Sequence, residues 1–245
     1  MRQLTLEIEP RPALGREDFL VSKGNRAAVE WIDRWPEWPA PSLALAGPAG
    51  SGKSHLAQVW RARSCAVALQ GAELLQTLPS LPDNNTQHCL IDEADRLAGD
   101  PVGEENLFHI YNRLNQQAGH LLLVGRSLPM RWPLEMPDLR SRLATAVPVE
   151  LAMPDDALMQ ALLVKLFSDR QLLPGKGVIE FLIMRMERSY AAASRIVSEM
   201  DTRALEERRE VRLPLARAVL HDLDRQERSV AEPHLEFERT EETEG

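Results

Sequence analysis

The chain has 245 residues, 44% of them hydrophobic, and a formal net charge of -8. That length and hydrophobic content can build one full α/β domain and a small second one, which excludes a wholly disordered chain. The negative charge argues against a protein that coats nucleic acid electrostatically. No apolar stretch approaches the roughly 20 residues of a membrane span, and the N-terminus lacks the apolar core of a signal peptide. We therefore expect a cytoplasmic protein with no membrane partner.

Residues 1–18 contain two prolines and few helix-forming signals, so an extended tail is expected there. Within it, Gln3 precedes apolar residues at alternate positions, Leu4, Leu6 and Ile8. In an extended peptide these three side chains can enter apolar pockets of a partner, while the Gln3 amide forms a hydrogen bond. An ordinary amphipathic strand of the fold shows the same alternation and is the alternative.

A helix is predicted over residues 25–35, where Ala28, Trp31, Ile32 and Trp35 recur at helical spacing. Short apolar runs typical of buried strands follow, and a further helical pattern spans residues 104–117. The predicted strands are 43–46, 66–69, 89–91, 121–124 and 146–149. Strands that alternate with helices predict an α/β fold, a parallel sheet with helices on both faces, which we assign to residues 19–153.

The first predicted strand runs into an octapeptide that fits the phosphate-binding loop G-x-x-x-x-G-K-[ST] at every fixed position. Such a loop turns backbone N–H groups toward phosphate oxygens at a helix N-terminus. Lys53 is expected to reach the β- and γ-phosphates of ADP or ATP, and the Ser54 hydroxyl to hold Mg²⁺. A glycine-rich turn that binds nothing is the alternative, but it would not need the Lys-Ser pair. The predicted nucleotide-binding residues are Gly47, Pro48, Ala49, Gly50, Ser51, Gly52, Lys53, Ser54 and His55.

The third predicted strand runs straight into the acidic sequence Asp92-Glu93-Ala94-Asp95. A carboxylate at the end of a parallel strand beside a phosphate loop can hold a water ligand of Mg²⁺, the role predicted for Asp92. Glu93 is predicted to orient or deprotonate an attacking water. A helix-capping acidic cluster is the alternative, for which Asp92 and Asp95 are both suited. The phosphate loop upstream favours the magnesium site.

Two arginines, Arg140 and Arg142, stand near the end of the predicted sheet region. An arginine inserted beside the γ-phosphate of a neighbouring subunit stabilises the charge of the transition state. A surface pair with ordinary ion contacts is the alternative.

The character of the chain changes after Pro154, where helical patterns replace the strands. Asp155 can cap a first helix, and three more are predicted around residues 178–186, around 196–200 and from 214 to about 225. We therefore expect a small helical lid domain over residues 154–226. Residues 227–245 are rich in glutamate and poor in apolar residues, which predicts an acidic, disordered end.

These segments together resemble the AAA+ ATPases of the DnaA branch. The similar segments spread over most of residues 19–200: 19–25, the phosphate loop, the acidic strand end, 107–112, 139–143 and 172–175. The resemblance implies an AAA+ sheet domain with a helical lid that binds ADP or ATP with Mg²⁺. In the family the first of these segments lies over the adenine base, so Leu20, Val21 and Asn25 become candidate nucleotide contacts. Arg142 falls where the family has its arginine finger.

DnaA carries a further DNA-reading helix-turn-helix domain, and nothing like it follows Arg225 in this sequence. A chain reduced to the AAA+ part is similar to the Hda-type regulators, which inactivate DnaA and so limit the initiation of replication. Those regulators dock on the DNA polymerase sliding clamp by an N-terminal Gln-Leu-x-Leu-x-Leu peptide, so Gln3, Leu4, Leu6 and Ile8 become candidate clamp contacts. The resemblance implies two partners, clamp and DnaA, with DNA reached only through the clamp and Arg142 acting in trans. Self-association is left open.

Two positions depart from the family pattern. Gly125-Arg126-Ser127 follows the fourth strand, where the family usually has a small polar sensor residue. An alanine stands where many relatives present a lid arginine, with Arg188 or Arg195 as the nearest substitutes. We therefore expect weak or absent ATP hydrolysis by this chain alone. An ATP-hydrolysing protein similar to helicase loaders and a nucleotide-binding scaffold are the rival functions.

Overall fold

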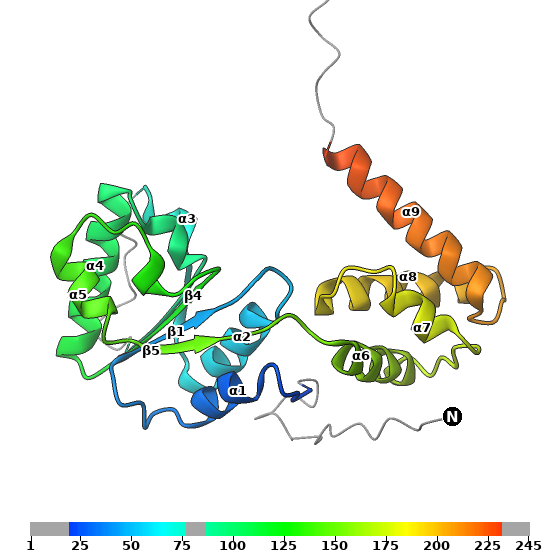
Figure 1. The fold of residues 1–245 in the computed structure, drawn as a ribbon, viewed down its shortest axis with the longest axis horizontal. Helices are drawn as coiled ribbons and strands as arrows, with labels where there is room; N and C mark the ends of the chain where they lie inside the picture. The colour runs from blue at the N-terminus through cyan, green and yellow to red at the C-terminus, as the bar shows by residue number, and fades with distance from the viewer. Residues whose placement is uncertain (1–19, 77–86, 232–245) are drawn as a thin grey trace, which may run out of the picture. The chain divides into compact units, whose positions relative to one another are not determined.

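The structure is a computed structural model that describes residues 20–76 and 87–231 (Figure 1). Its contacts divide the chain into two compact units, residues 1–161 with 188–190 and residues 162–187 with 191–245. The sequence places a domain boundary before Pro154, whereas this division falls inside helix α6 (Asp156–Asp169). The first unit therefore includes the start of the first lid helix.

The first unit contains one five-stranded parallel sheet with the strand order β2-β3-β4-β1-β5. Its strands are β1 (Ser42–Ala46), β2 (Val67–Gln70), β3 (His88–Asp92), β4 (His120–Gly125) and β5 (Val147–Glu150). Each lies within one residue of its predicted bounds. The predicted α/β class and the parallel sheet are confirmed.

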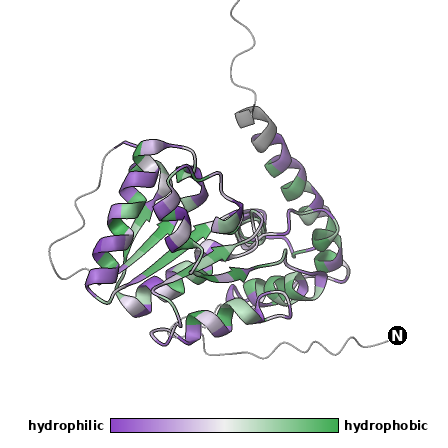
Figure 2. Cartoon of the chain, turned by 60° about the vertical axis from the view of Figure 1, so that its left-hand side comes forward, coloured by the Kyte–Doolittle hydropathy of each residue, from purple (hydrophilic) through white to green (hydrophobic). Residues whose placement is uncertain are grey.

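Helices cover both faces of this sheet because the strands are apolar on both sides. Alternate side chains, such as Leu43, Leu45 and Leu122, pack with α1 (Arg26–Asp33) and α2 (Lys53–Ser64). Side chains between them, such as Ile91 and Leu123, pack with α4 (Pro101–Gln116) and α5 (Pro137–Leu143) on the other face. Figure 2 shows the strands in the hydrophobic colour and the helices in both colours, as expected for helices with one face buried.

The sequence analysis did not identify several short helical elements of this unit. They are α3 (Gly71–Leu74), α5 and the two 3₁₀ turns η1 (Ala94–Leu97) and η2 (Pro129–Arg131). The long helix α4, by contrast, begins three residues before its predicted start at Glu104, where the Asp100 carboxylate accepts a hydrogen bond from the Gly103 N–H at 2.7 Å. A proline at its first position adds to this signal, because proline needs no helical N–H donor there.

The second unit is helical, as expected, with the end of α6 followed by α7 (Val178–Ile183), α8 (Tyr190–Glu206) and α9 (Leu213–Ala231). The predicted cap of α6 is present, since the Leu158 N–H donates to the Asp155 carboxylate at 2.8 Å. Buried residues of all four helices form the core of this unit: Leu163, Phe167, Val178, Leu182, Ile196, Val197, Met200, Ala216 and Val219. The prediction of a disordered end from residue 227 is wrong in its first five residues, because α9 continues to Ala231. Arginine, glutamine and glutamate are good helix formers and extend it.

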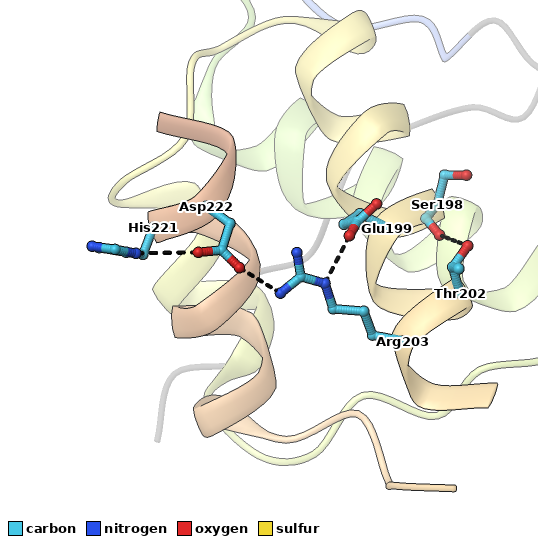
Figure 3. A network of polar contacts seen from close by, with 6 residues as sticks. All are labelled: Ser198, Glu199, Thr202, Arg203, His221 and Asp222. Carbon is cyan, nitrogen blue, oxygen red and sulfur yellow. Dashed lines mark hydrogen bonds and ion pairs between the residues drawn. The ribbon is translucent and has the colours of Figure 1, made fainter. Parts of the chain in front are cut away.

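An ion-pair network joins α8 to α9 in this unit (Figure 3). The Arg203 guanidinium lies between two carboxylates, with its Nε 2.7 Å from Glu199 and its Nη1 2.7 Å from Asp222. The Arg203 hydrogen bond holds the pKa of Asp222 below its ordinary value, with a smaller contribution from His221. The network therefore fixes the register of two helices at the surface of the unit.

No helix in residues 20–76 and 87–231 is both long enough and apolar enough to cross a membrane.

Candidate nucleotide site

The parallel register brings the phosphate loop and the acidic run to one edge of the sheet, the edge where the strands end. Ala46, the last residue of β1, pairs with Gly125, the last residue of β4. Asp92, the last residue of β3, pairs with Gln70 at the end of β2. The loop that follows β1 and the acidic run that follows β3 therefore lie at the same carboxyl edge, separated only by the end of β4. Ligands of open parallel sheets bind outside this edge.

The phosphate loop has a conformation that only its glycines permit. A Cβ atom at Gly47 would lie 2.6 Å from the backbone oxygen of Leu151, so no other residue fits where the loop leaves the sheet. Gly52 has a φ of 94° and forms the N-cap of α2. The N-cap Gly52 has no side chain to cap this helix start, which leaves the first backbone N–H groups of α2 to other acceptors.

Lys53, the first residue of α2, folds back over this loop. Its Nζ donates to the backbone oxygens of Gly47 and Pro48, each at 2.7 Å. Burial lowers the pKa of the Lys53 ammonium, Asp92 and Asp95 act in the opposite direction, and Arg126 lowers it further. Lys53 therefore lies close enough to Asp92 and Asp95 for their charges to affect its pKa.

The acidic run does not act as a helix cap, which was the alternative for it. The 3₁₀ turn η1 starts at Glu93 without a hydrogen bond from a side chain. Asp92 accepts a hydrogen bond from the Glu93 N–H at 2.9 Å, and Asp95 accepts one from the Arg126 N–H at 2.9 Å. Asp95 therefore ties the segment after β3 to the segment after β4.

Glu93, the predicted water-orienting residue, has a left-handed backbone with a φ of 53°. Its exposed carboxylate forms an ion pair with Arg96 at 3.0 Å.

The side chains available for a metal fit Mg²⁺. Ser54 is exposed and Asp92 is half-buried, and both offer oxygen. The described residues hold no cluster of three His, Cys, Asp or Glu side chains able to bind a metal ion. Mg²⁺ is commonly held by one or two protein oxygens, with phosphate oxygens and waters completing its shell. Ser54 and Asp92 could therefore hold it only together with a nucleotide.

The predicted adenine contacts Leu20, Val21 and Asn25 lie in a segment that hydrogen-bonds to itself. The Asn25 amide accepts from the Ser22 N–H at 2.7 Å and donates to the Leu20 backbone oxygen at 2.9 Å. Asn25 and Val21 are buried, and Leu20 is partly exposed. Asn25 thus shapes the segment, and contact with a base stays a prediction for all three residues.

Arg142, the predicted arginine finger, lies on α5 over two aromatic rings of α4. Its Cζ is 4.8 Å from the centroid of the Phe108 ring and 5.7 Å from that of Tyr111. Arg140 instead donates to the backbone oxygen of Leu134. Arg142 is not among the charges that shift the pKa of Lys53. The structure does not bring Arg142 into the cluster around Lys53.

Glu104 has a role that the sequence analysis missed. This residue is only 2% exposed, and its carboxylate accepts hydrogen bonds from the N–H groups of Gly99, Glu135 and Met136 at 2.7–3.0 Å. Burial opposes ionisation, but these three donors and Arg140 outweigh it and lower the pKa of Glu104. Because Met136 is the N-cap of α5, Glu104 fixes the start of the helix that carries Arg142. A glutamate at the start of a helix is common, so only the fold reveals this role.

The remaining predicted residues, which include His55 and Arg188, are described one by one. The His55 ring packs edge-on against Tyr190 of the first unit, with centroids 5.3 Å apart. Arg188, a candidate lid arginine, forms an ion pair with Asp156 at 2.6 Å. The predicted clamp peptide, Gln3, Leu4, Leu6 and Ile8, lies outside the described residues.

No protein-family model matches the sequence. Solved structures do match the fold. Domain III of the replication initiation protein DnaA from Thermotoga maritima aligns with a TM-score of 0.72 and 19% identity, over 87% of this chain and 98% of that domain. AMPPCP-bound DnaA from Aquifex aeolicus aligns at 0.66 and 19%, over 90% of this chain and 71% of that one. The Holliday junction branch migration motor RuvB from Thermotoga maritima aligns at 0.56 and 19%, over 75% and 62%. At such identities the likeness shows the fold, which is that of the AAA+ domain of DnaA.

Proposed function

We propose that this chain is an Hda-type regulator of the DnaA initiator. It binds ADP or ATP with Mg²⁺, docks on the DNA-loaded sliding clamp, and promotes hydrolysis of the ATP bound to DnaA. DnaA then passes into its ADP form, which limits the initiation of chromosome replication. The observation that carries the proposal is the placement of Lys53 and Asp92 at one edge of a sheet with the fold of the DnaA AAA+ domain.

The nucleotide serves as an assembly element more than as a substrate. The loop amides and Lys53 hold its phosphates, and Ser54 with Asp92 hold Mg²⁺. Mg²⁺ supplies neutralisation of phosphate charge when it is bound.

Arg142 is proposed to act on the nucleotide of DnaA. One observation supports this proposal: Arg142 lies over the rings of Phe108 and Tyr111, which hold the guanidinium in a defined place. An arginine that reaches a neighbour's γ-phosphate stabilises charge in the transition state and can raise the rate by about 10³–10⁵.

The N-terminal peptide is proposed to bring the chain to the clamp. Its support is the sequence pattern alone, a glutamine followed by alternate apolar residues at Leu4, Leu6 and Ile8. Replacement of Gln3, Leu4 and Leu6 by alanine should abolish clamp binding and leave nucleotide affinity intact.

A reconstituted assay tests the proposal. Turnover of DnaA-bound ATP is measured with this chain, loaded clamp and nucleotide, each also omitted in turn. We expect stimulation that needs all three and is lost with Arg142→Ala. Equal turnover with and without this chain would refute the regulator function.

The second candidate is an ATP-hydrolysing protein similar to helicase loaders. The intact pair Asp92-Glu93 after β3 favours it. Robust hydrolysis by the purified chain without DnaA or clamp, abolished by Glu93→Gln, would support this candidate over the regulator.

A further inference from the structure

One face of helix α4 contacts helix α5 near both of its ends. Glu104, Phe108 and Tyr111 stand at positions i, i+4 and i+7 of α4, which places their side chains on the same side of this helix. The Glu104 carboxylate accepts hydrogen bonds at 2.7–3.0 Å from the last two N–H groups before α5 begins. The rings of Phe108 and Tyr111 lie under the Arg142 guanidinium, in the last turn of α5.

These two contacts have matching spacings along the two helices. Arg142 follows Met136, the N-cap of α5, by about 9 Å of helix. Along α4, Phe108 follows Glu104 by about 6 Å and Tyr111 follows it by about 10 Å. Because α5 is a single short helix between the two contacts, a shift of its start along α4 moves Arg142 along the rings by a similar distance.

The start of α5 depends on the carboxylate of Glu104. The Met136 side chain forms no capping hydrogen bond, so the helix start is held by the acceptor that α4 supplies. A glutamine at position 104 would offer one acceptor oxygen and turn its NH₂ group toward backbone N–H donors. Leu139 and Leu143 are buried under α5, so the helix stays packed on the core when this anchor is lost. The change therefore alters the position of the helix more than its presence.

We infer that Glu104 is a positioning residue for Arg142, which sets where α5 presents the guanidinium to the nucleotide of the partner. The inference rests on the proposed action of Arg142 in trans. Misplacement of a reacting group by about 1 Å can cost on the order of 100-fold in rate. Glu104 is 2% exposed and cannot contact a partner itself. Its effect therefore falls on the rate of the stimulated reaction and not on association with DnaA.

The first test measures turnover of DnaA-bound ATP with loaded clamp at increasing concentrations of the full chain. We compare the wild type, Glu104→Gln, Glu104→Asp and Arg142→Ala, with Glu105→Gln as the matched control. Glu105 is the next residue of α4, and its exposed carboxylate pairs with His109 at 3.6 Å. Thermal unfolding shows that each variant is folded at the assay temperature.

Glu104→Gln should lower the maximal stimulated rate by about 10–100-fold and change the half-saturating concentration by less than about twofold. Glu104→Asp keeps the charge and should recover part of the rate. Glu105→Gln should match the wild type in both quantities.

The second test locates Arg142 in the pure chain by NMR, without DnaA or clamp. Protons of a guanidinium held over an aromatic face are shifted by the ring, so the Arg142 side-chain resonances report its place on Phe108 and Tyr111. Glu104→Gln should move these resonances toward those of an exposed arginine, and Glu105→Gln should leave them unchanged.

The outcomes separate this inference from the proposed function. A wild-type maximal rate in Glu104→Gln, a loss confined to the half-saturating concentration, or Arg142 resonances that stay in place would overturn the positioning role and leave the action of Arg142 standing. A wild type that does not stimulate DnaA, or stimulation that survives Arg142→Ala, would overturn the proposed function itself and this inference with it.

Discussion

The two edges of the sheet are built from different chemistry. The carboxyl edge carries charges and glycines, with Lys53, Asp92, Asp95 and Arg126 in one electrostatic cluster. The amino edge, where the strands begin, carries aromatic rings that pack on one another. They belong to Trp35, Trp38, Trp60, His88 and His120.

The contacts at the amino edge show what the difference means. The Trp38 ring stacks on Trp60 with centroids 5.5 Å apart, and the Trp38 Nε1 donates to the Trp31 backbone oxygen at 2.7 Å. Trp60 is fully buried. Such an edge contributes packing energy. Exposed charges, such as those of the carboxyl edge, add little to the free energy of unfolding. The amino edge therefore serves stability and the carboxyl edge serves binding.

Among the variants considered, Trp60→Ala at the amino edge should cause the largest loss of stability. Removal of a fully buried tryptophan leaves a cavity and costs about 3–5 kcal/mol of the free energy of unfolding. Urea unfolding measures this loss. Nucleotide affinity, measured below the unfolding transition, should stay at the wild-type value.

The half-exposed Trp31 provides the control, because Trp31→Ala should cost clearly less while retaining the backbone oxygen that accepts from Trp38. A Trp60→Ala variant that loses nucleotide affinity at temperatures where it is fully folded would show that the two edges are coupled.

Lys53→Ala changes the carboxyl edge and should have the opposite effect, a loss of binding with little loss of stability. The variant loses the ammonium expected to reach the phosphates, so nucleotide affinity should fall by at least about 100-fold. Its unfolding temperature without nucleotide should change little, because the charge removed is partly desolvated. Calorimetry gives the affinity and a thermal scan gives the stability.

Lys176→Ala removes an exposed lysine of the second unit and should change neither quantity. If Lys53→Ala instead unfolds at a markedly lower temperature, the two bonds of Lys53 to loop oxygens stabilise the fold more than the comparison of edges allows.

Glu104→Gln sharpens the comparison, because Glu104 is a buried charge held by backbone N–H groups. The amide replaces one acceptor oxygen by a donor that faces backbone N–H groups, so a loss of about 1–3 kcal/mol is expected. Amide exchange at Glu135 and Met136 should become faster, which locates the loss at the start of α5.

Asp138→Asn is a suitable control, since it removes a carboxylate from the first turn of the same helix. Unchanged exchange at residues 135 and 136 in Glu104→Gln would contradict the assigned role of Glu104.

The strands could be predicted because each is an apolar run bounded by breakers, and the parallel order followed from their alternation with helices. Helix α5 could not, because two apolar residues, Leu139 and Leu143, are too few to establish a helical period in a seven-residue segment. The phosphate loop and the role of Asp92 were predicted from local motifs.

The roles of Asp95 and Glu104 depend on which strand ends are neighbours and which loops pass a buried carboxylate. Asp95 binds a backbone N–H 31 residues away in sequence, and Glu104 binds others 31 and 32 residues away. Sequence spacing carries no signal for such contacts.

Acidification should lower the free energy of unfolding through the histidines of the amino edge and leave the chemistry of the carboxyl edge intact. This is the smallest of the expected effects. Burial lowers the pKa of His88 and of His120, and the neighbouring His120 lowers that of His88 further. The His88 Nδ1 also accepts a hydrogen bond from the His120 N–H at 3.2 Å, which requires that nitrogen to be unprotonated. The folded chain therefore binds fewer protons than the unfolded chain below the ordinary histidine pKa of about 6.5. Stability present above that pH is lost as the pH falls through 6.5, by at most about 1.4 kcal/mol per pH unit for each group.

Urea unfolding at several pH values should show this fall for the wild type and a shallower one for His120→Phe. The exposed His109 lies elsewhere, on α4, and His109→Phe should keep the wild-type slope. Equal slopes for all three proteins would mean that the histidines do not titrate with folding and that the amino edge is insensitive to pH.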